Sequence, residues 1–480
     1  MKKNNLFMIL KYLVLFVFLV VFFNFYTKID ERSIFIVSWF SNIIFVNIFL
    51  DIYKKCKNYM DFGIVFLTIV ILFCNGQMLL YSFGVPYSDL SIFKYSFSKV
   101  YFAAKYFLYS FLMFGLAFVL NTNNKSAERK TIETTCSSVD IAIKKFSYFC
   151  LIIFSFPFLY SKINQLMISL RYGYDSIYYG NFSSSIQFAD FIGYFSNLFV
   201  ISLLFLVYVY RNKKGLRKIF SLSILLLILI YFVTGMRGSA LTLLISYLLI
   251  YFKFVNIKKS NKFIIISSIA ILVLLFIPII KNYRGSSSKN WSDFTSSISN
   301  SNNSAVVETI SEIGGSMAPF IMTSNIIPNP FPYRYGLSYV SSFLAIIPSS
   351  IYGTSFFTDN SALDIWLMKT YNMSYGPGFS IMAESYYNFG YYGGIFFSFV
   401  IGMFISYVLN YKSKKSEYHN LNELFSITFL LMSMMIARGA FFHTPKCIIY
   451  LMMIPFFAII QISKKNNSSE KKGGNICVQK

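Results

Sequence analysis

Uninterrupted apolar segments, each close to the length of a membrane-spanning helix, recur along this chain between short polar connectors. An α-helix needs about 20 apolar residues to cross the hydrocarbon core of a bilayer, because each residue advances it by only about 1.5 Å. The chain of 480 residues is 56% hydrophobic and 13% charged, so a soluble fold would lack the polar surface to cover its core. The pattern predicts an all-α fold, a polytopic bundle of about 12 transmembrane helices.

The predicted spans are followed by connectors of very unequal length. The spans cover residues 6–24, 33–52, 62–81, 100–120, 146–163, 189–210, 219–235, 238–255, 263–281, 389–410, 423–437 and 446–462. The predicted organisation is therefore helices one to nine (1–281), a large loop (282–388), helices ten to twelve (389–462) and a tail (463–480).

Positive charge alternates between the connectors. Of the 43 Lys and Arg residues, 27 fall on the side that holds both chain ends, 15 fall on the other side or at its boundary, and Lys11 lies inside the first span. Connectors rich in Lys and Arg stay in the cytoplasm, which predicts two cytoplasmic termini and an outer large loop. The net charge of +24 is spread over these connectors, so it indicates membrane orientation and not a nucleic-acid partner.

The large loop contains several short helical patterns. Residues 306–322 read as one amphipathic helix, a Pro-rich turn follows at 328–332, and 362–371 read as another short helix. The apolar segment 339–351 is too short to span the bilayer and is expected to lie in the membrane interface.

The predicted spans carry no ionisable residue at mid-depth, since Lys11, Lys105 and Lys162 lie near enough to a span end to reach the interface. This argues against an ion-coupled transporter. Arginine supplies six of the 15 outer cations but only three of the 27 inner ones. A guanidinium makes planar bidentate contacts with phosphate, whereas Lys offers a point charge.

Three of the outer arginines, Arg237, Arg284 and Arg438, are followed by glycine at predicted membrane boundaries. They are candidate phosphate ligands, and the alternative is that they are interfacial anchors beside turn glycines. Glu384, at the start of span ten, is a candidate general base or a carboxylate favoured by the helix N-terminus. His443 is a second candidate base or a structural residue. The two histidines have no metal-ligand spacing around them.

One stretch before and within span ten resembles a known family. Residues 375–394 read Tyr-Gly-Pro-Gly-Phe-Ser-Ile-Met-Ala-Glu-Ser-Tyr-Tyr-Asn-Phe-Gly-Tyr-Tyr-Gly-Gly, with Ser380, Glu384 and Asn388 spaced along it. This is similar to the Wzy-type O-antigen and capsule repeat-unit polymerases, as is the turn at 234–238, Thr-Gly-Met-Arg-Gly.

The resemblance implies a bacterial cytoplasmic-membrane enzyme with a GT-C-like bundle, without metal or cofactor. Its substrate would be an undecaprenyl-diphosphate-linked oligosaccharide, and a flippase and a chain-length regulator would be its partners. Arg237, Arg284, Glu384 and His443 would be catalytic. The expected substrate-binding residues are Arg171, Arg334, Arg438, Asn388 and Ser380. Two other functions remain open from the sequence: a flippase of lipid-linked oligosaccharide, which usually has short loops and a charged cavity, and an O-antigen ligase, which shares the donor.

Overall fold

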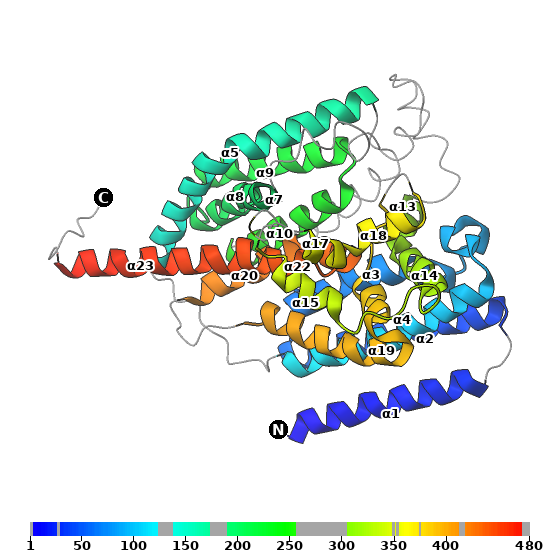
Figure 1. The fold of residues 1–480 in the computed structure, drawn as a ribbon. Coiled ribbons are helices and arrows are strands. Elements are labelled where there is room, and N and C mark those ends of the chain that lie inside the picture. The colour runs from blue at the N-terminus through cyan, green and yellow to red at the C-terminus, as the bar shows by residue number, and fades with distance from the viewer. Residues whose placement is uncertain are drawn as a thin grey trace. The chain divides into compact units, whose positions relative to one another are not determined.

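The computed structural model describes residues 3–25, 29–122, 138–172, 190–255, 305–347, 351, 355–373, 376–411 and 418–472. Within these ranges the secondary structure is helical and no β-strand occurs, which confirms the all-α prediction (Figure 1). Eight of the described helices are long and apolar enough to cross a membrane. Two further apolar helices, Gly193–Val209 and Gly238–Phe254, are shorter. The predicted span at 263–281 lies outside the described residues.

The helices group into two compact units, which are described separately. The first unit contains α1 (Lys3–Phe25), α2 (Glu31–Cys56), α3 (Phe62–Ser82), η1 (Tyr87–Asp89), η2 (Ser91–Lys94), α4 (Phe97–Asn121), α13 (Ala305–Ile313), η4 (Gly314–Ser316), α14 (Met317–Ile326), α15 (Leu337–Leu344), α17 (Phe356–Ser361), α18 (Leu363–Thr370), α19 (Ile381–Leu409) and α21 (Ser433–Arg438). The second contains α5 (Ser138–Tyr172), α7 (Asp190–Ser196), α8 (Leu198–Val209), α9 (Lys214–Val233), α10 (Arg237–Phe254), α20 (His419–Leu431), η6 (Ile448–Met453) and α23 (Ile454–Lys472). The short helix α22 (His443–Cys447) contains a boundary between the units.

Polar residues at the predicted span boundaries begin the helices. The Asp30 side chain accepts a hydrogen bond from the backbone N–H of Ser33 (2.8 Å) and starts α2 with a capping box. Asp61 accepts from the N–H of Gly63 (2.9 Å) at the start of α3, and Ser380 caps α19. These caps satisfy amides that have no partner inside the helix.

The core of the first unit forms around α4, which packs on α2 and α19 (Figure 1). Close contact with α19 is possible because Gly402 has no side chain: a Cβ there would lie 2.8 Å from the backbone oxygen of Phe114. At the end of α4, the Asn121 amide donates to the Ser406 hydroxyl (2.7 Å). Small residues and side-chain hydrogen bonds of this kind are what hold helices together in lipid, where the hydrophobic effect between helices is weak.

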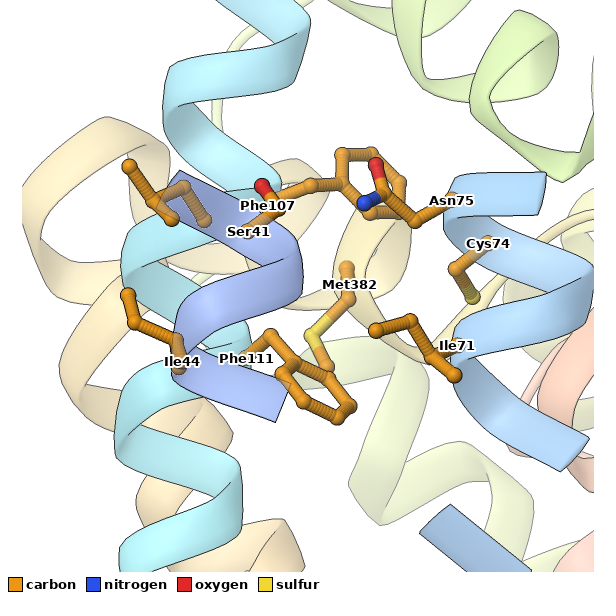
Figure 2. Close-up of a pocket in the computed structure, with 9 residues that line it drawn as sticks. Ser41, Ile44, Ile71, Cys74, Asn75, Phe107, Phe111 and Met382 are labelled. Carbon is orange, nitrogen blue, oxygen red and sulfur yellow. The ribbon is translucent and has the colours of Figure 1, made fainter. Parts of the chain in front are cut away.

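A small cavity lies between α2, α3, α4 and α19 in this unit (Figure 2). Figure 2 shows Ser41, Asn75 and Met382 around it, together with aromatic and aliphatic side chains. Its free space admits roughly one water molecule. It is therefore a packing defect in the helix core and too small to bind a sugar.

The expected amphipathic helix over 306–322 is wrong as a single element. The chain forms α13, then the 3-10 turn η4, then α14, so the helix breaks at Gly314. This glycine packs on α3 so closely that a Cβ would lie 2.6 Å from the Cα of Gly76. Close packing against another backbone, not the hydrophobic period, ends α13. The short helix predicted over 362–371 is confirmed as α18.

Several helices expose large apolar side chains along one face. α1 exposes Leu6, Phe7, Leu10, Val14 and Val17, and α9 exposes Ile219, Leu222, Leu226 and Leu229. Soluble monomers rarely expose apolar surface on this scale, whereas lipid-facing helices require it. The exposed faces therefore agree with the predicted membrane protein.

Several predicted helix ends differ from the structure. α5 runs from Ser138 to Tyr172, where a span over 146–163 was predicted. α19 begins at Ile381, so the last residues of the predicted loop already belong to the helix. α23 continues through Lys472, which makes the first part of the predicted tail helical.

Candidate functional site

From Ile381 on, the family-like motif forms the first part of α19, which has a kink at Gly390. Gly390 has φ +70°, a left-handed conformation that side chains disfavour. The Tyr333 ring occupies the space beside it, since a Cβ on Gly390 would lie 2.9 Å from the ring carbon Cζ. The glycine of the Asn-Phe-Gly sequence is therefore required both by the backbone angle and by this aromatic contact.

The kink releases backbone carbonyls from the regular helix ladder, and the segment before α15 supplies donors to them. The N–H of Tyr335 donates to the Asn388 carbonyl (2.9 Å), and the N–H of Arg334 donates to the Tyr387 carbonyl (3.3 Å). A buried carbonyl without a donor is costly in a membrane protein. These two bonds therefore fix residues of the large loop against α19.

Asn388 reinforces the same attachment with its side chain. Its Oδ1 accepts from the N–H of Gly336 (3.0 Å), and its Nδ2 donates to the Ser338 hydroxyl (2.8 Å) and to the Glu384 carbonyl (2.9 Å). The side chain is fully buried. These three hydrogen bonds hold α15 and the residue before it on α19.

Glu384 lies one turn before Asn388 and is also fully buried. One carboxylate oxygen accepts from the Ser338 hydroxyl (2.6 Å), and the other accepts from the backbone N–H of Phe441 (2.6 Å). Both oxygens thus face protein donors, and the side chain connects three segments: α15, α19 and the turn after α21. In this structure Glu384 is therefore enclosed by protein, with a hydrogen-bond donor on each carboxylate oxygen.

A tyrosine of α15 completes the buried polar network. The Tyr339 hydroxyl lies 3.2 Å from the Ser385 hydroxyl. Burial, with a smaller effect of the nearby Glu384 carboxylate, raises the pKa of Tyr339 well above its ordinary value. Its phenol is therefore a neutral hydrogen-bonding group that helps to hold α15 in place.

Arg438 ends α21 and contacts the start of the motif. Its carbonyl accepts from the N–H of Phe379 (2.8 Å). Gly378, with φ +77°, lies so close that a Cβ there would come 3.1 Å from the Arg438 carbonyl oxygen and 3.5 Å from its side-chain Nε. The Arg438 side chain itself is exposed. The motif therefore fixes the backbone of an arginine whose guanidinium is accessible.

His443 follows within the same turn. Its backbone N–H donates to the Ala440 carbonyl (3.4 Å). Its ring lies against Gly439, where an added Cβ would be 3.4 Å from the imidazole Cδ2. The imidazole is partly exposed. Residues 438–443 thus form one turn that carries both an arginine and a histidine and that Glu384 holds at Phe441.

The other predicted site residues lie in different places. Ser380 is the N-cap of α19, where its hydroxyl accepts from the N–H of Ala383 (3.1 Å). Arg334 lies in the first unit, and its Nε is buried without a hydrogen-bond partner among the described residues. Arg171, near the end of α5, and Arg237, the first residue of α10, belong to the second unit. Arg284 lies outside the described residues.

Sequence reasoning missed the partners of these residues. Ser338 bonds both Glu384 and Asn388, and Gly336 and Gly378 provide the backbone turns. Ser338 had no signal because a lone serine in an apolar loop segment resembles many others. The two glycines carried a signal that was available, since a Gly in the segment just before a helix often takes a left-handed conformation.

The assembled site offers an exposed cation and an imidazole on a rigid support. A buried carboxylate that accepts two hydrogen bonds, and a buried amide that makes three, hold the turn and α15 with little freedom. An exposed guanidinium on a fixed backbone could stabilise negative charge on a phosphate leaving group.

Comparison with known proteins adds one match. A family model described as O-antigen polysaccharide polymerase Wzy matches residues 7–468, nearly the whole chain. No curated protein sequence and no solved structure matched the chain.

Proposed function

Since this chain belongs to the O-antigen polysaccharide polymerase Wzy family, we propose that it joins glycan repeat units while both partners are attached to a carrier-lipid diphosphate. Membership of the family confirms the resemblance seen in the motif and makes the protein a multi-pass membrane polymerase of the glycosyltransferase type. The match over nearly the entire chain is the observation that carries this proposal.

The proposed reaction transfers the growing glycan to a new repeat unit. The bond between the sugar C1 and the diphosphate oxygen of the growing chain breaks, and undecaprenyl diphosphate leaves with the bonding electrons. A hydroxyl of the lipid-linked repeat unit forms the new bond to C1 and loses its proton to a base. The barrier falls if a cation meets the charge that develops on the diphosphate.

In this proposal arginine cations, without a metal ion, stabilise the diphosphate. Arg438 is the described residue that fits best, because it is exposed while its backbone is fixed by Phe379. His443 is the proposed base, because it is the partly exposed titratable group on the same turn. Glu384 and Asn388 act as positioning residues in this account. Arg237 and Arg284 are kept as proposed ligands of the diphosphate, and Arg171 and Arg334 as proposed substrate-binding residues.

The proposed location is the outer face of a bacterial cytoplasmic membrane, with both termini in the cytoplasm. The support is the placement of 27 of the 43 cations in alternate connectors. The undecaprenyl-diphosphate substrate would reach this face through a separate flippase, and a chain-length regulator is a further proposed partner.

The experiment is to delete the gene and examine the surface glycan by gel ladder. A polymerase mutant still displays single repeat units and loses the longer chains. A flippase mutant traps repeat units inside the cell, and a ligase mutant makes polymer that stays on the carrier lipid. Either of these outcomes would replace the polymerase proposal.

The role of Arg438 is tested by complementing the deletion with Arg438→Lys. Lys keeps the charge but cannot make a bidentate contact with phosphate, so the long chains should decrease by about tenfold or more. Arg32→Lys is the matched control, because Arg32 is also exposed and lies at the start of a spanning helix. Equal ladders from the two variants at equal protein level would remove Arg438 from the proposed site.

A further inference from the structure

One lysine of the second unit lies within a spanning helix and has no acidic partner in the part of the chain that the structure describes. Lys162 belongs to α5, about 36 Å along the helix from Ser138 at about 1.5 Å per residue. Its ammonium donates to the Gln165 side-chain oxygen (3.0 Å) and lies over the Phe158 ring (5.7 Å) and the Tyr231 ring (5.3 Å). These neutral contacts stabilise the cation, and among the described residues no carboxylate pairs with it.

Three other cations of the described helices have acidic partners. Lys11 pairs with Asp51 (2.5 Å), Arg211 pairs with Asp140 (2.9 Å), and Lys253 pairs with Glu423 (2.9 Å). An unpaired cation in a spanning helix, even one near the end of the span such as Lys162, often marks a functional position. Lys162 therefore needs an explanation that these ion-paired residues do not.

Lys162 also contacts the turn between α9 and α10. Its Nζ lies 3.9 Å from the sulfur of Met236, the residue directly before α10. Met236 caps this helix without a side-chain hydrogen bond, and Gly235 turns the chain with φ +82°. The first amides of a helix have no acceptor inside it, and they favour an anion.

The Lys162 ammonium and the N-terminus of α10 therefore lie close together, and each attracts a negatively charged group. An ammonium has three donors, and one of those of Lys162 is used by Gln165. The Met236 sulfur is only a weak acceptor. The Lys162 ammonium therefore keeps free donor capacity at a position where the described residues supply no anion.

We propose that Lys162, with the first turn of α10, binds a phosphate group of the carrier-lipid diphosphate. This inference rests on the proposed function, because that function requires a diphosphate on the lipid substrate. The recognising chemistry is a lipid-borne phosphate, which a phospholipid headgroup shares. Arg237, the first residue of α10, is part of the same turn in the sequence.

The test measures binding of undecaprenyl diphosphate to purified protein in phosphatidylcholine nanodiscs. Lys162→Gln should weaken binding by about tenfold or more, because it removes a charged donor. Lys105→Gln is the matched control, because Lys105 also lies over an aromatic ring, that of Tyr101 at 4.8 Å, within a spanning helix. It should bind like the unaltered protein. Equal affinities for the Lys162 and Lys105 variants would overturn the proposal.

A second measurement uses the unaltered chain and so does not depend on the folding of a variant. Undecaprenyl diphosphate should protect the Lys162 amine from acylation, read by mass spectrometry, and should leave Lys105 unprotected. Undecaprenol and phosphatidylglycerol form the comparison arms. Protection by phosphatidylglycerol equal to that by the diphosphate would assign the site to a general lipid phosphate and overturn the carrier-lipid assignment.

Failure of this inference and failure of the proposed function look different. If the unaltered protein extends glycans and the Lys162→Gln variant binds and extends equally well, the proposed function stands and the lysine site is wrong. If the unaltered protein neither binds the diphosphate nor extends glycans, the proposed function itself is wrong.

Discussion

Adding one methyl group at Gly378 should disturb the position of Arg438. Gly378 has φ +77°, and a non-glycine residue in this region costs roughly 1–2 kcal/mol. The new Cβ would also lie 3.1 Å from the Arg438 carbonyl oxygen and 3.4 Å from its Cγ. The Arg438 turn or the motif must therefore move, and the adjacent hydrogen bond from Phe379 (2.8 Å) would weaken.

The expected effect on activity follows from this displacement. A shift of about 1 Å in a group that stabilises the transition state can reduce the rate by about a hundredfold. The contact at Gly378 needs a shift of a few tenths of an ångström, so we expect Gly378→Ala to lower polymer formation by about tenfold. The assay is the gel ladder of surface glycan in a complemented deletion strain, with the amount of membrane-inserted protein matched.

Gly376→Ala is the matched control, because it makes the same chemical change two residues away. Gly376 has no atom within 4 Å of an added Cβ, and its φ is not in the left-handed region. The activity of the Gly376→Ala variant should stay within about twofold of that of the unaltered protein, because the added methyl group meets no neighbouring atom. If Gly378→Ala is as active as Gly376→Ala, the claim that the motif positions Arg438 is refuted.

Two further substitutions test the buried network. Glu384→Ala leaves the Phe441 N–H and the Ser338 hydroxyl without their acceptor, which should destabilise the protein by about 2–6 kcal/mol. Glu384→Gln keeps one acceptor and should cost less. The thermal unfolding midpoint in detergent measures both, and equal midpoints for the two variants would speak against the network. Gly390→Ala forces a Cβ to 2.9 Å from Tyr333 at φ +70° and should lower the yield of folded protein in the membrane. Gly193→Ala is the control and should not lower the yield, because no atom lies within 4 Å of the added Cβ. Similar yields of the two variants would show that the kink tolerates a side chain.

The membrane fold was predictable because its main constraint is local. A span needs a contiguous apolar segment, and such segments are visible in the sequence without knowledge of the partners. The start of α2 is also set locally, because Asp30 lies directly before the helix and caps it. The break at Gly314 was not predictable, because it depends on contact with Gly76, more than 200 residues earlier.

The candidate site was predictable in its members but not in their roles. The motif pointed to Ser380, Glu384 and Asn388, and the structure brings them to one region. Only the structure showed that Glu384 is fully buried and that both its oxygens have protein donors. From the sequence, a carboxylate at a membrane boundary is a candidate base. Its burial could not be predicted, because α15 and the turn after α21, which cover it, are distant in the chain.

Reconstitution tests the central claim of a polymerase most directly. Purified protein in liposomes would receive repeat units linked to undecaprenyl diphosphate, and the products would be separated by length. We expect a ladder of longer lipid-linked chains, with one undecaprenyl diphosphate released for each unit added. Movement of unextended repeat units across the bilayer, without a ladder or release of the carrier, would contradict the account.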